Sequence, residues 1–361
     1  MLAMFFFLFA RPGGAQDQAT LKRWKSPQRV TIKARKISVA DAIAKLTKRT
    51  GTAVRVDEDK QDTKITLSLE KATFFEALDE IAQRAGLALT VRTSSRAYLS
   101  LVKRPEGMKR IPPVLRGPLR IDVLGVYSSR FGTRRFSPNA SAARERPRAL
   151  WVEMRCMAEP GMEGLFLDRI ELIEVTDDSD RSLIDTREFE TLYINRAIRL
   201  NLRADGRGSL KINTLRGKLV AYIPGKIEEI KFTGGARNIS RKLGTATLKV
   251  HRIEKTRYQR AEMTVTLTGN PCPAIRGKPS LRVMTSRYGS TQATPDPSVV
   301  GIYAFDRRGE TIGGSISTFL GRDSVTTVRL DKMPSRIVVK AITRAERIEV
   351  PFRFTDLPIP R

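Results

Sequence analysis

Cysteine and histidine are scarce in this chain of 361 residues, which contains two cysteines and one histidine. Cys156 and Cys272 are too few for a disulfide framework or for a zinc site made of four cysteines. His251 alone excludes a zinc site of three histidines, and any histidine-dependent mechanism would have to use it. We expect two buried free thiols, with a disulfide between them as the alternative, and a structural or surface imidazole at His251.

Long apolar runs are also missing, because no window of about 18 apolar residues occurs after the start of the chain. The first residues are a short exception. Leu2 to Ala10 are apolar, and the small residues Gly13 and Ala15 follow, which resembles the apolar region and cleavage site of a secretory signal. We expect residues 1–15 to be a signal segment, with a short retained anchor as the alternative. We expect residues 16–27 to be a flexible N-terminus, and we expect no transmembrane span.

Acidic residues are few relative to basic ones, since 38 aspartates and glutamates stand against 66 lysines and arginines, a net charge of +28. The excess is spread along the whole chain and does not form the clustered stripe that is typical of nucleic-acid-binding proteins. Aromatic residues, which would stack on bases, make up only 7% of the chain. We therefore expect no nucleic-acid partner. An exported protein of this charge would instead meet anionic envelope polymers, lipid headgroups or acidic proteins.

Recognisable catalytic and cofactor-binding motifs are missing as well. The glycine-rich segments 206–209 and 313–315 are too short for a phosphate-binding loop, and no Gly-x-Ser-x-Gly motif occurs. Glu228 and Glu229 are adjacent on an expected strand, so their carboxylates point to opposite faces and cannot flank one bond. The acidic run 177–180 is typical of a hairpin turn, with a calcium site as the alternative. We predict no catalytic, cofactor-binding or metal-binding residues, and we expect no enzyme.

An internal repeat occupies the first third of the chain, where residues 30–56 and 65–91 match each other thirty-five positions apart. Each copy has an alternating segment, an amphipathic helical segment and a second alternating segment. The clearest matches are Val30-Thr31-Ile32 with Ile65-Thr66-Leu67, Lys36 with Lys71, Ala42-Ile43 with Ala77-Leu78, and Gly51 with Gly86.

Local signals mark where the two helices begin and end. Ser38 and Thr73 are the expected N-caps, each followed three residues later by an acidic residue, and Gly51 and Gly86 end the helices. A further alternating segment follows at 97–102. The pattern predicts an α+β domain with the order β-α-β-β-α-β plus a further strand, in which two helices pack on a small mixed sheet.

A set of core and turn positions in this region resembles a known family. The positions are Val39-x-x-Ala42-Ile43-x-x-Leu46 before Gly51, then Lys64-Ile65-x-Leu67, and Phe75-x-Ala77-Leu78-x-x-Ile81 before Gly86-Leu87. Through them, residues 28–102 resemble the short N-terminal domain shared by secretins and TonB-dependent transporters. The resemblance implies a periplasmic setting and contacts with other proteins, and it transfers no active site. No barrel, plug or secretin pore follows, so we expect no gated channel.

The remaining chain carries no such resemblance and is expected to be all-β. A proline-rich linker at 104–118 follows the first domain, which we place at 28–103. Beyond it, short alternating segments are separated by Gly, Pro, Asp and Asn. We predict two tandem β-sandwiches, 119–243 with a surface loop at 129–148, and 244–361. One larger sandwich is the alternative.

A weaker repeat supports two sandwiches. Residues 174–183 resemble residues 303–312, each as a strand, an acidic turn and a strand, and residues 216–232 resemble residues 334–350. Trp151 lies at an inward position of an expected strand and is predicted to be in the core.

Together these observations predict an exported, non-enzymatic adaptor or assembly protein of a cell envelope, located in the periplasm. It would contact an envelope protein through its N-terminal domain, by an exposed sheet edge. The alternative is a periplasmic binding module for an anionic polysaccharide or peptidoglycan.

Overall fold

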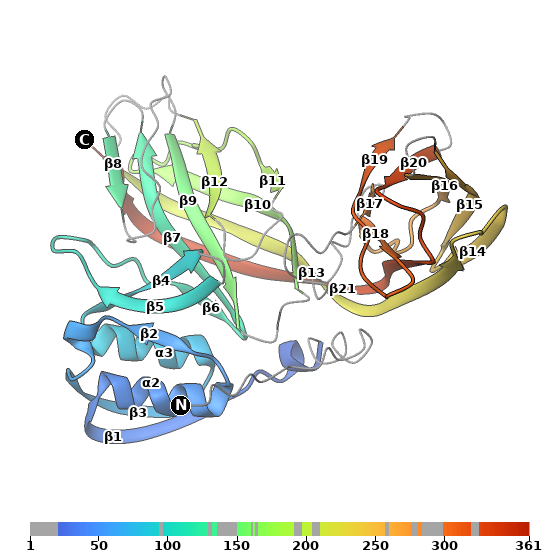
Figure 1. Cartoon of the computed structure of the whole chain (residues 1–361). Coiled ribbons are helices and arrows are strands. Elements are labelled where there is room, and N and C mark those ends of the chain that lie inside the picture. The colour runs from blue at the N-terminus through green and yellow to red at the C-terminus, as the bar shows by residue number, and fades with distance from the viewer. Residues whose placement is uncertain are drawn as a thin grey trace, which may run out of the picture. The chain divides into compact units, whose positions relative to one another are not determined.

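The computed structural model consists mostly of strands, with few helices and several sheets (Figure 1). It forms two compact units. We call the first the larger unit, Lys22–Ala221 with Ile348–Arg361, and the second the inserted unit, Tyr222–Arg347. The residues that the structure describes are 21–93, 97–128, 132–135, 150–159, 162, 165–190, 197–203, 210–256, 260–275, 280–283, 299–318 and 325–360.

The larger unit begins with the N-terminal module, residues 30–103. Its elements, in chain order, are β1 (Val30–Ser38), α2 (Val39–Thr50), β2 (Val54–Val56), η1 (Glu58–Lys60), β3 (Lys64–Ala72), α3 (Phe74–Arg84), β4 (Leu87–Thr93) and β5 (Ala97–Lys103).

These strands form two sheets, so the prediction of one small mixed sheet was wrong. β1 pairs antiparallel with β3, whereas β5 lies between a parallel β2 and an antiparallel β4. The helices lie between the two sheets (Figure 1), with α2 against β1 and β2, and α3 against β3 and β4. The width of the apolar face of α3 explains this arrangement, because an arc that wide has to be covered from two sides. The buried residues of α3 are Phe74, Phe75, Ala77, Leu78, Ile81 and Ala82.

The internal repeat is visible in the backbones of β1 and β3, each of which contains a β-bulge. Corresponding lysines adopt left-handed φ angles there, 50° at Lys36 and 49° at Lys71. The Lys36 N–H donates to Thr66 Oγ1 at 3.5 Å, and the Lys71 N–H donates to Thr31 Oγ1 at 3.2 Å. These two bonds are reciprocal, because the threonines also correspond in the repeat. The duplicated sequence therefore folds as two equivalent halves.

The helix boundaries follow the predicted local signals. The Ser38 hydroxyl accepts a backbone N–H of the first turn of α2 at 3.1 Å. Thr73 and Glu76 form a complete capping box at the start of α3. Gly51 and Gly86 follow the helices with φ angles of 73° and 68°, a conformation that glycine adopts without steric cost.

The rest of the larger unit contains two sheets. One has the order β12-β9-β7-β6, with β8 paired to β7, and the other begins β11-β10-β13-β21. The strands are β6 (Val114–Arg116), β7 (Leu119–Ser128), β8 (Gly132–Arg135), β9 (Leu150–Ala158), β10 (Phe166–Asp177), β11 (Glu188–Glu190), β12 (Ala197–Leu202), β13 (Lys211–Thr233) and β21 (Arg336–Pro358). Strand β6 lies within the expected linker 104–118 and β8 lies within the expected loop 129–148, so each of these segments contains a strand that was not predicted.

Strands β13 and β21 are each 23 residues long and take part in both units. Lys218 pairs with Glu349 at 3.1 Å and Lys340 pairs with Glu229 at 3.0 Å, so the two neighbouring strands run antiparallel. The end of the chain returns to the larger unit, where Ile359 N–H donates to a backbone carbonyl at 2.9 Å. The observed division is therefore an insertion of residues 222–347 into the larger unit. It differs from the tandem order with a boundary near residue 244.

The inserted unit packs a five-stranded sheet, β14-β15-β16-β20-β19, over β18 and the adjoining half of β21. Buried apolar residues from β15, β16, β18, β20 and β21 share one core, as in a β-sandwich. Its strands are β14 (Ile239–Leu243), β15 (Ala246–Lys255), β16 (Ala261–Thr268), β17 (Ser280–Val283), β18 (Val299–Phe305), β19 (Gly314–Thr318) and β20 (Val325–Leu330).

The weaker repeat is present as two turns with the same hydrogen bonds. The Asp177 carboxylate accepts the backbone N–H groups two and four positions later, at 2.9 and 3.0 Å. The Asp306 carboxylate accepts the corresponding groups, both at 2.9 Å. The acidic run 177–180 is therefore a turn closed by its own carboxylate, as predicted.

Some predictions lie outside the described residues: the signal segment 1–15, most of the loop 129–148, and the glycine-rich segment 206–209. Of the expected flexible N-terminus, residues 21–25 are helical. Within the part of the chain that is described, none of the helices combines the length and apolar character needed to cross a membrane.

Candidate functional site: an arginine-rich junction

Strands β7 and β9 bury charged side chains that their sequence pattern would place in water. Arg120, Asp122 and Arg155 are 6%, 8% and 3% exposed. They alternate with apolar residues along each strand, and Asp122 lies directly opposite Arg155 in the antiparallel register. The same face carries Met157, which belongs to the hydrophobic core of the N-terminal module. The charged face of this sheet is therefore covered by the module instead of by solvent.

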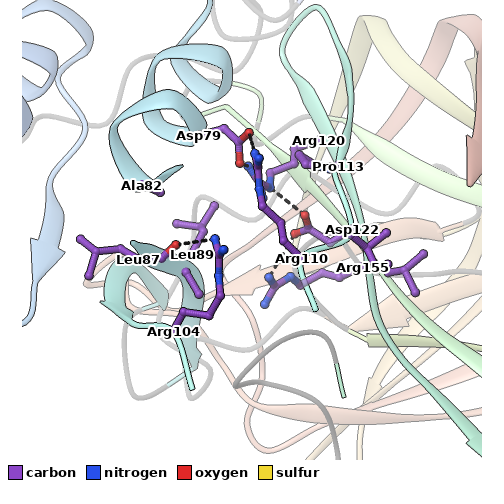
Figure 2. Close-up of a pocket in the computed structure, with 13 residues that line it drawn as sticks. Asp79, Ala82, Leu87, Leu89, Arg104, Arg110, Pro113, Arg120, Asp122 and Arg155 are labelled. Carbon is purple, nitrogen blue, oxygen red and sulfur yellow. Dashed lines mark hydrogen bonds and ion pairs between the residues drawn. The ribbon is translucent and has the colours of Figure 1, made fainter. Parts of the chain in front are cut away.

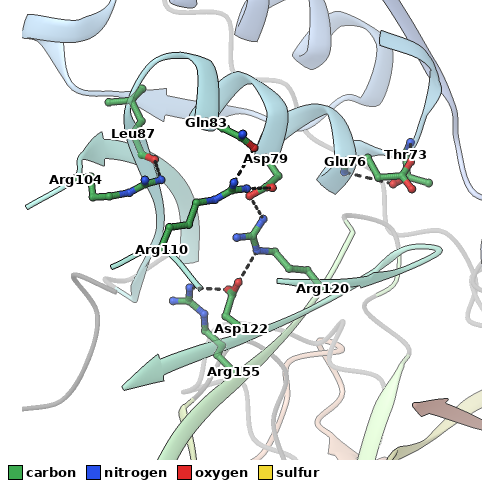
Figure 3. A network of polar contacts seen from close by, with 10 residues as sticks. All are labelled: Thr73, Glu76, Asp79, Gln83, Leu87, Arg104, Arg110, Arg120, Asp122 and Arg155. Carbon is green, nitrogen blue, oxygen red and sulfur yellow. Dashed lines mark hydrogen bonds and ion pairs between the residues drawn. The ribbon is translucent and has the colours of Figure 1, made fainter. Parts of the chain in front are cut away.

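Ion pairs join this face to helix α3 (Figure 3). Asp122 accepts from Arg120 Nε at 2.8 Å and from Arg155 Nη2 at 3.2 Å. Arg120 also donates to Asp79 of α3 at 3.2 Å, and Arg110 of the linker donates to the other Asp79 oxygen at 2.5 Å. Both aspartates thus bridge two guanidinium groups. This alternation of charges links α3, the linker, β7 and β9 into one junction.

A second contact holds the start of α3. Glu159, which follows β9 and is 4% exposed, accepts the Phe74 backbone N–H at 2.9 Å. This N–H is one of the donors that a helix leaves without an internal partner. Burial raises the pKa of the Glu159 carboxyl from 4.5 to about 7, although the bond from Phe74 opposes this rise. The carboxyl therefore titrates close to neutral pH in the folded protein.

A pocket of about 50 Å³ opens within the junction (Figure 2). Arg104 lies at its edge and donates to the Leu87 carbonyl at 2.9 Å. Charged groups dominate the lining, and the apolar part comes from α3, β4, the linker and β7. The lining residues are Asp79, Ala82, Leu87, Ala88, Leu89, Arg104, Arg110, Ile111, Pro113, Arg120, Asp122, Val123 and Arg155. Such a site is suited to holding an anionic group, since guanidinium groups match carboxylate and phosphate geometry.

The opposite side of the N-terminal module presents a different surface, which we call the basic outer face. It consists of the exposed charged residues of β1 and β3, five of them basic and one acidic: Lys33, Arg35, Lys36, Lys64, Lys71 and Glu70. Lys33 pairs with Glu70 at 2.9 Å. Among the described residues, β1 and β3 pair only with each other, so each strand has one open edge.

Most of the residues singled out from the sequence lie apart from this junction. Cys156 is the exception, because it follows Arg155 in β9. Cys156, in β9, and Cys272 are buried free thiols, and burial raises the pKa of both. His251, on β15, shares a hydrogen bond of 2.9 Å with Thr266 Oγ1. Trp151 is buried and stacks on Tyr127 with ring centroids 5.3 Å apart, which confirms its place in the core.

The two adjacent glutamates also behave as expected. Glu228 accepts the Gly244 N–H at 2.9 Å, whereas Glu229 pairs with Lys340 at 3.0 Å, so the two carboxylates serve different partners. Within the described ranges, no three His, Cys, Asp or Glu side chains are grouped so that they could hold a metal ion.

Comparisons with known proteins leave the family open. No family model matches the chain, and no curated protein matches it. One solved structure that aligns with it is an atomic model of the Salmonella SPI-1 type III secretion injectisome basal body proteins InvG, PrgH and PrgK. The alignment covers 90% of this chain and 92% of that one, at 10% identity and a TM-score of 0.18. A TM-score this low shows no common fold, and the resemblance of residues 28–102 to secretin N-terminal domains stays a prediction.

Proposed function

We propose that the protein is an exported, non-enzymatic adaptor or assembly protein of a cell envelope. It binds a protein partner through the basic outer face of its N-terminal module. The observation that carries this proposal is the β1–β3 sheet, which offers two open edges next to a surface of one predominant charge. Open edges pair with an added strand through main-chain hydrogen bonds, and charged neighbours select the partner.

The junction supports this role mechanically. Helix α3 is held at its start by Glu159 and along its length by Asp79. The module is therefore fixed to the strands that follow it, with its basic outer face directed away from them. A partner bound there would be attached to the whole larger unit, as an adaptor requires.

The experiment is capture of partners from an envelope extract with the full chain as bait. We expect a defined acidic protein to be retained, and to be lost when Arg35 and Lys64 are both replaced by Glu. The matched control is the double replacement of Lys242 and Lys249 by Glu, which reverses two exposed charges in the inserted unit. Equal recovery with both double variants would contradict the proposed surface, and a cytosolic location on cell fractionation would contradict export.

The second candidate is binding of an anionic polysaccharide or peptidoglycan. The excess of lysine and arginine on the basic outer face favours it, because such contacts need charge more than shape. In this case retention on isolated polymer would fall steeply with salt, and would fall for both double variants.

A further inference from the structure

The pocket in the junction contains more positive than negative charge. Four guanidinium groups and two carboxylates line it. The oxygens of Asp79 are taken by Arg110 and Arg120, and those of Asp122 by Arg120 and Arg155. Each of the four carboxylate oxygens of the lining therefore already accepts from an arginine, and the lining contains one further cation.

Arg104 is that further cation. Its guanidinium donates to a backbone carbonyl, that of Leu87, and it forms no ion pair with a carboxylate among the described residues. A guanidinium has five N–H donors, so most of those of Arg104 are open to a ligand. Arg110, which also lines the pocket, is half-buried and donates to Asp79 and Gln83. These two arginines come from the same linker, and both are partly exposed to solvent.

The pocket has the size and polarity of a small anion site. About 10–15 Å³ of such space holds one water molecule, so its volume of about 50 Å³ admits a group the size of a phosphate or a carboxylate. Low-dielectric walls strengthen the attraction of the surplus charge for an anion. Lysine would supply only a point charge, whereas arginine offers the planar pair of donors that oxyanions bind.

We propose that this pocket binds a small oxyanion, a phosphate or carboxylate group, with Arg104 as its principal contact and Arg110 as the second. The site lies apart from the basic outer face and requires no protein partner. Its test therefore stands or falls independently of the adaptor role.

The test is isothermal titration of the full chain with inorganic phosphate and, separately, with acetate, at an ionic strength matched with chloride. We expect saturable binding of at least one of them with a dissociation constant below about 10 mM. Arg104→Gln, which keeps a donor for the Leu87 carbonyl, should weaken binding about tenfold or more, a loss of roughly 1.4 kcal/mol. Preference for phosphate would identify a phosphoryl ligand, and preference for acetate a carboxylate ligand.

The matched control is Arg241→Gln, which removes the same charge from an exposed position on β14 and should change the dissociation constant less than about twofold. If Arg104→Gln does not fold, Arg110→Gln serves as the second variant, because glutamine can still bond to Gln83. Absence of saturable binding of both anions would overturn the proposal. Equal weakening by Arg104→Gln and Arg241→Gln would also overturn it, since a general loss of positive charge would give this result.

Discussion

Replacing Glu159 by glutamine should make the protein more stable at high pH and leave its stability unchanged at low pH. Glu159 is 4% exposed and accepts the N–H of Phe74 at the start of α3. Glutamine has nearly the same shape, and its carbonyl oxygen can accept the same bond. The substitution therefore removes the titration of a buried carboxyl and keeps its contact.

The expected size follows from the pKa, which burial raises from 4.5 to about 7. In the unfolded chain the carboxyl loses its proton near pH 4.5, whereas in the folded protein it keeps the proton to about pH 7. Between these values the folded protein binds more protons, so the free energy of unfolding falls as the pH rises. The full loss is roughly 3 kcal/mol, since each tenfold change in acidity is worth about 1.4 kcal/mol.

Two charged groups near Glu159 act on it in opposite directions and are present in both proteins. Arg23 lowers its pKa and Glu76 raises it, and both effects are smaller than that of burial. Subtracting the variant from the parent at each pH cancels the titration of the groups that do not interact with Glu159. What is left is the contribution of Glu159 together with its interactions with these two neighbours.

The assay is urea unfolding followed by circular dichroism at intervals between about pH 4 and pH 8.5. We expect equal stability of the two proteins near pH 4 and an advantage of roughly 3 kcal/mol for Glu159→Gln above pH 7.5. Glu106→Gln, at an exposed carboxylate, is the control and should give a flat difference. A flat difference for Glu159→Gln would refute the reasoning, because it would mean that this carboxyl is in water and that α3 is not docked on β9.

Three further predictions concern the rest of the fold. Asp122→Ala leaves Arg120 and Arg155 buried with one partner fewer, and should lower the free energy of unfolding by about 3–5 kcal/mol in urea. Gly51→Ala and Gly86→Ala place a Cβ at φ angles of 73° and 68°, and each should cost about 1–2 kcal/mol by the same assay. Cys156 and Cys272 are buried with raised thiol pKa values, so a thiol reagent should label neither in the folded protein and both after unfolding.

Each of these predictions has a result that would contradict it. Glu70→Ala, which breaks an exposed pair with Lys33, is the control for Asp122→Ala and should lower the free energy of unfolding by less than about 1 kcal/mol. An equally small loss for Asp122→Ala would mean that the junction is not buried. Clearly unequal costs at Gly51 and Gly86 would argue against two equivalent halves. Rapid labelling of either cysteine in the folded chain would place that thiol at the surface.

The parts of the fold that could be predicted are those specified by nearby residues. Ser38 and Thr73 start the helices and Gly51 and Gly86 follow them, because caps and C-terminal glycines act within a few positions. The turn at Asp177 could be predicted for the same reason. By contrast, whether strands β1 to β5 form one sheet or two depends on the width of the apolar face of α3 that the strands have to cover. This is decided by how the elements pack together and not by residues close in sequence.

The sequence does not predict the division into units, because this division depends on strand β21, whose second half belongs to the larger unit again. The similarity of residues 216–232 to residues 334–350 suggests two consecutive domains. The pairing of β13 with β21 instead brings the end of the chain back to the larger unit. Nothing local to either strand specifies this, since it depends on contacts between residues more than a hundred positions apart, such as Lys218 and Glu349.

The alternating pattern of β7 and β9 does not predict the junction. Polar residues at every second position, such as Arg120 and Asp122, normally indicate a strand face in water. Here a second layer covers that face, and the strands are buried on both sides. One signal was available: Asp122 on one strand and Arg155 on the next carry opposite charges, and the antiparallel register places them directly across from each other.

The basic residues behind the net charge of +28 lie in at least two separate places in the fold, although they are spread evenly along the sequence. Part of it lies inside the junction, where Arg120 pairs with Asp79 and Asp122 and Arg155 pairs with Asp122, and these ion pairs fix the N-terminal module in one orientation. Another part lies on the basic outer face, where Arg35 and Lys64 are in water. Because a fixed module presents its open edges in one direction, weakening the junction through Asp122 should also weaken capture of a partner, although Asp122 lies on the other side of the module.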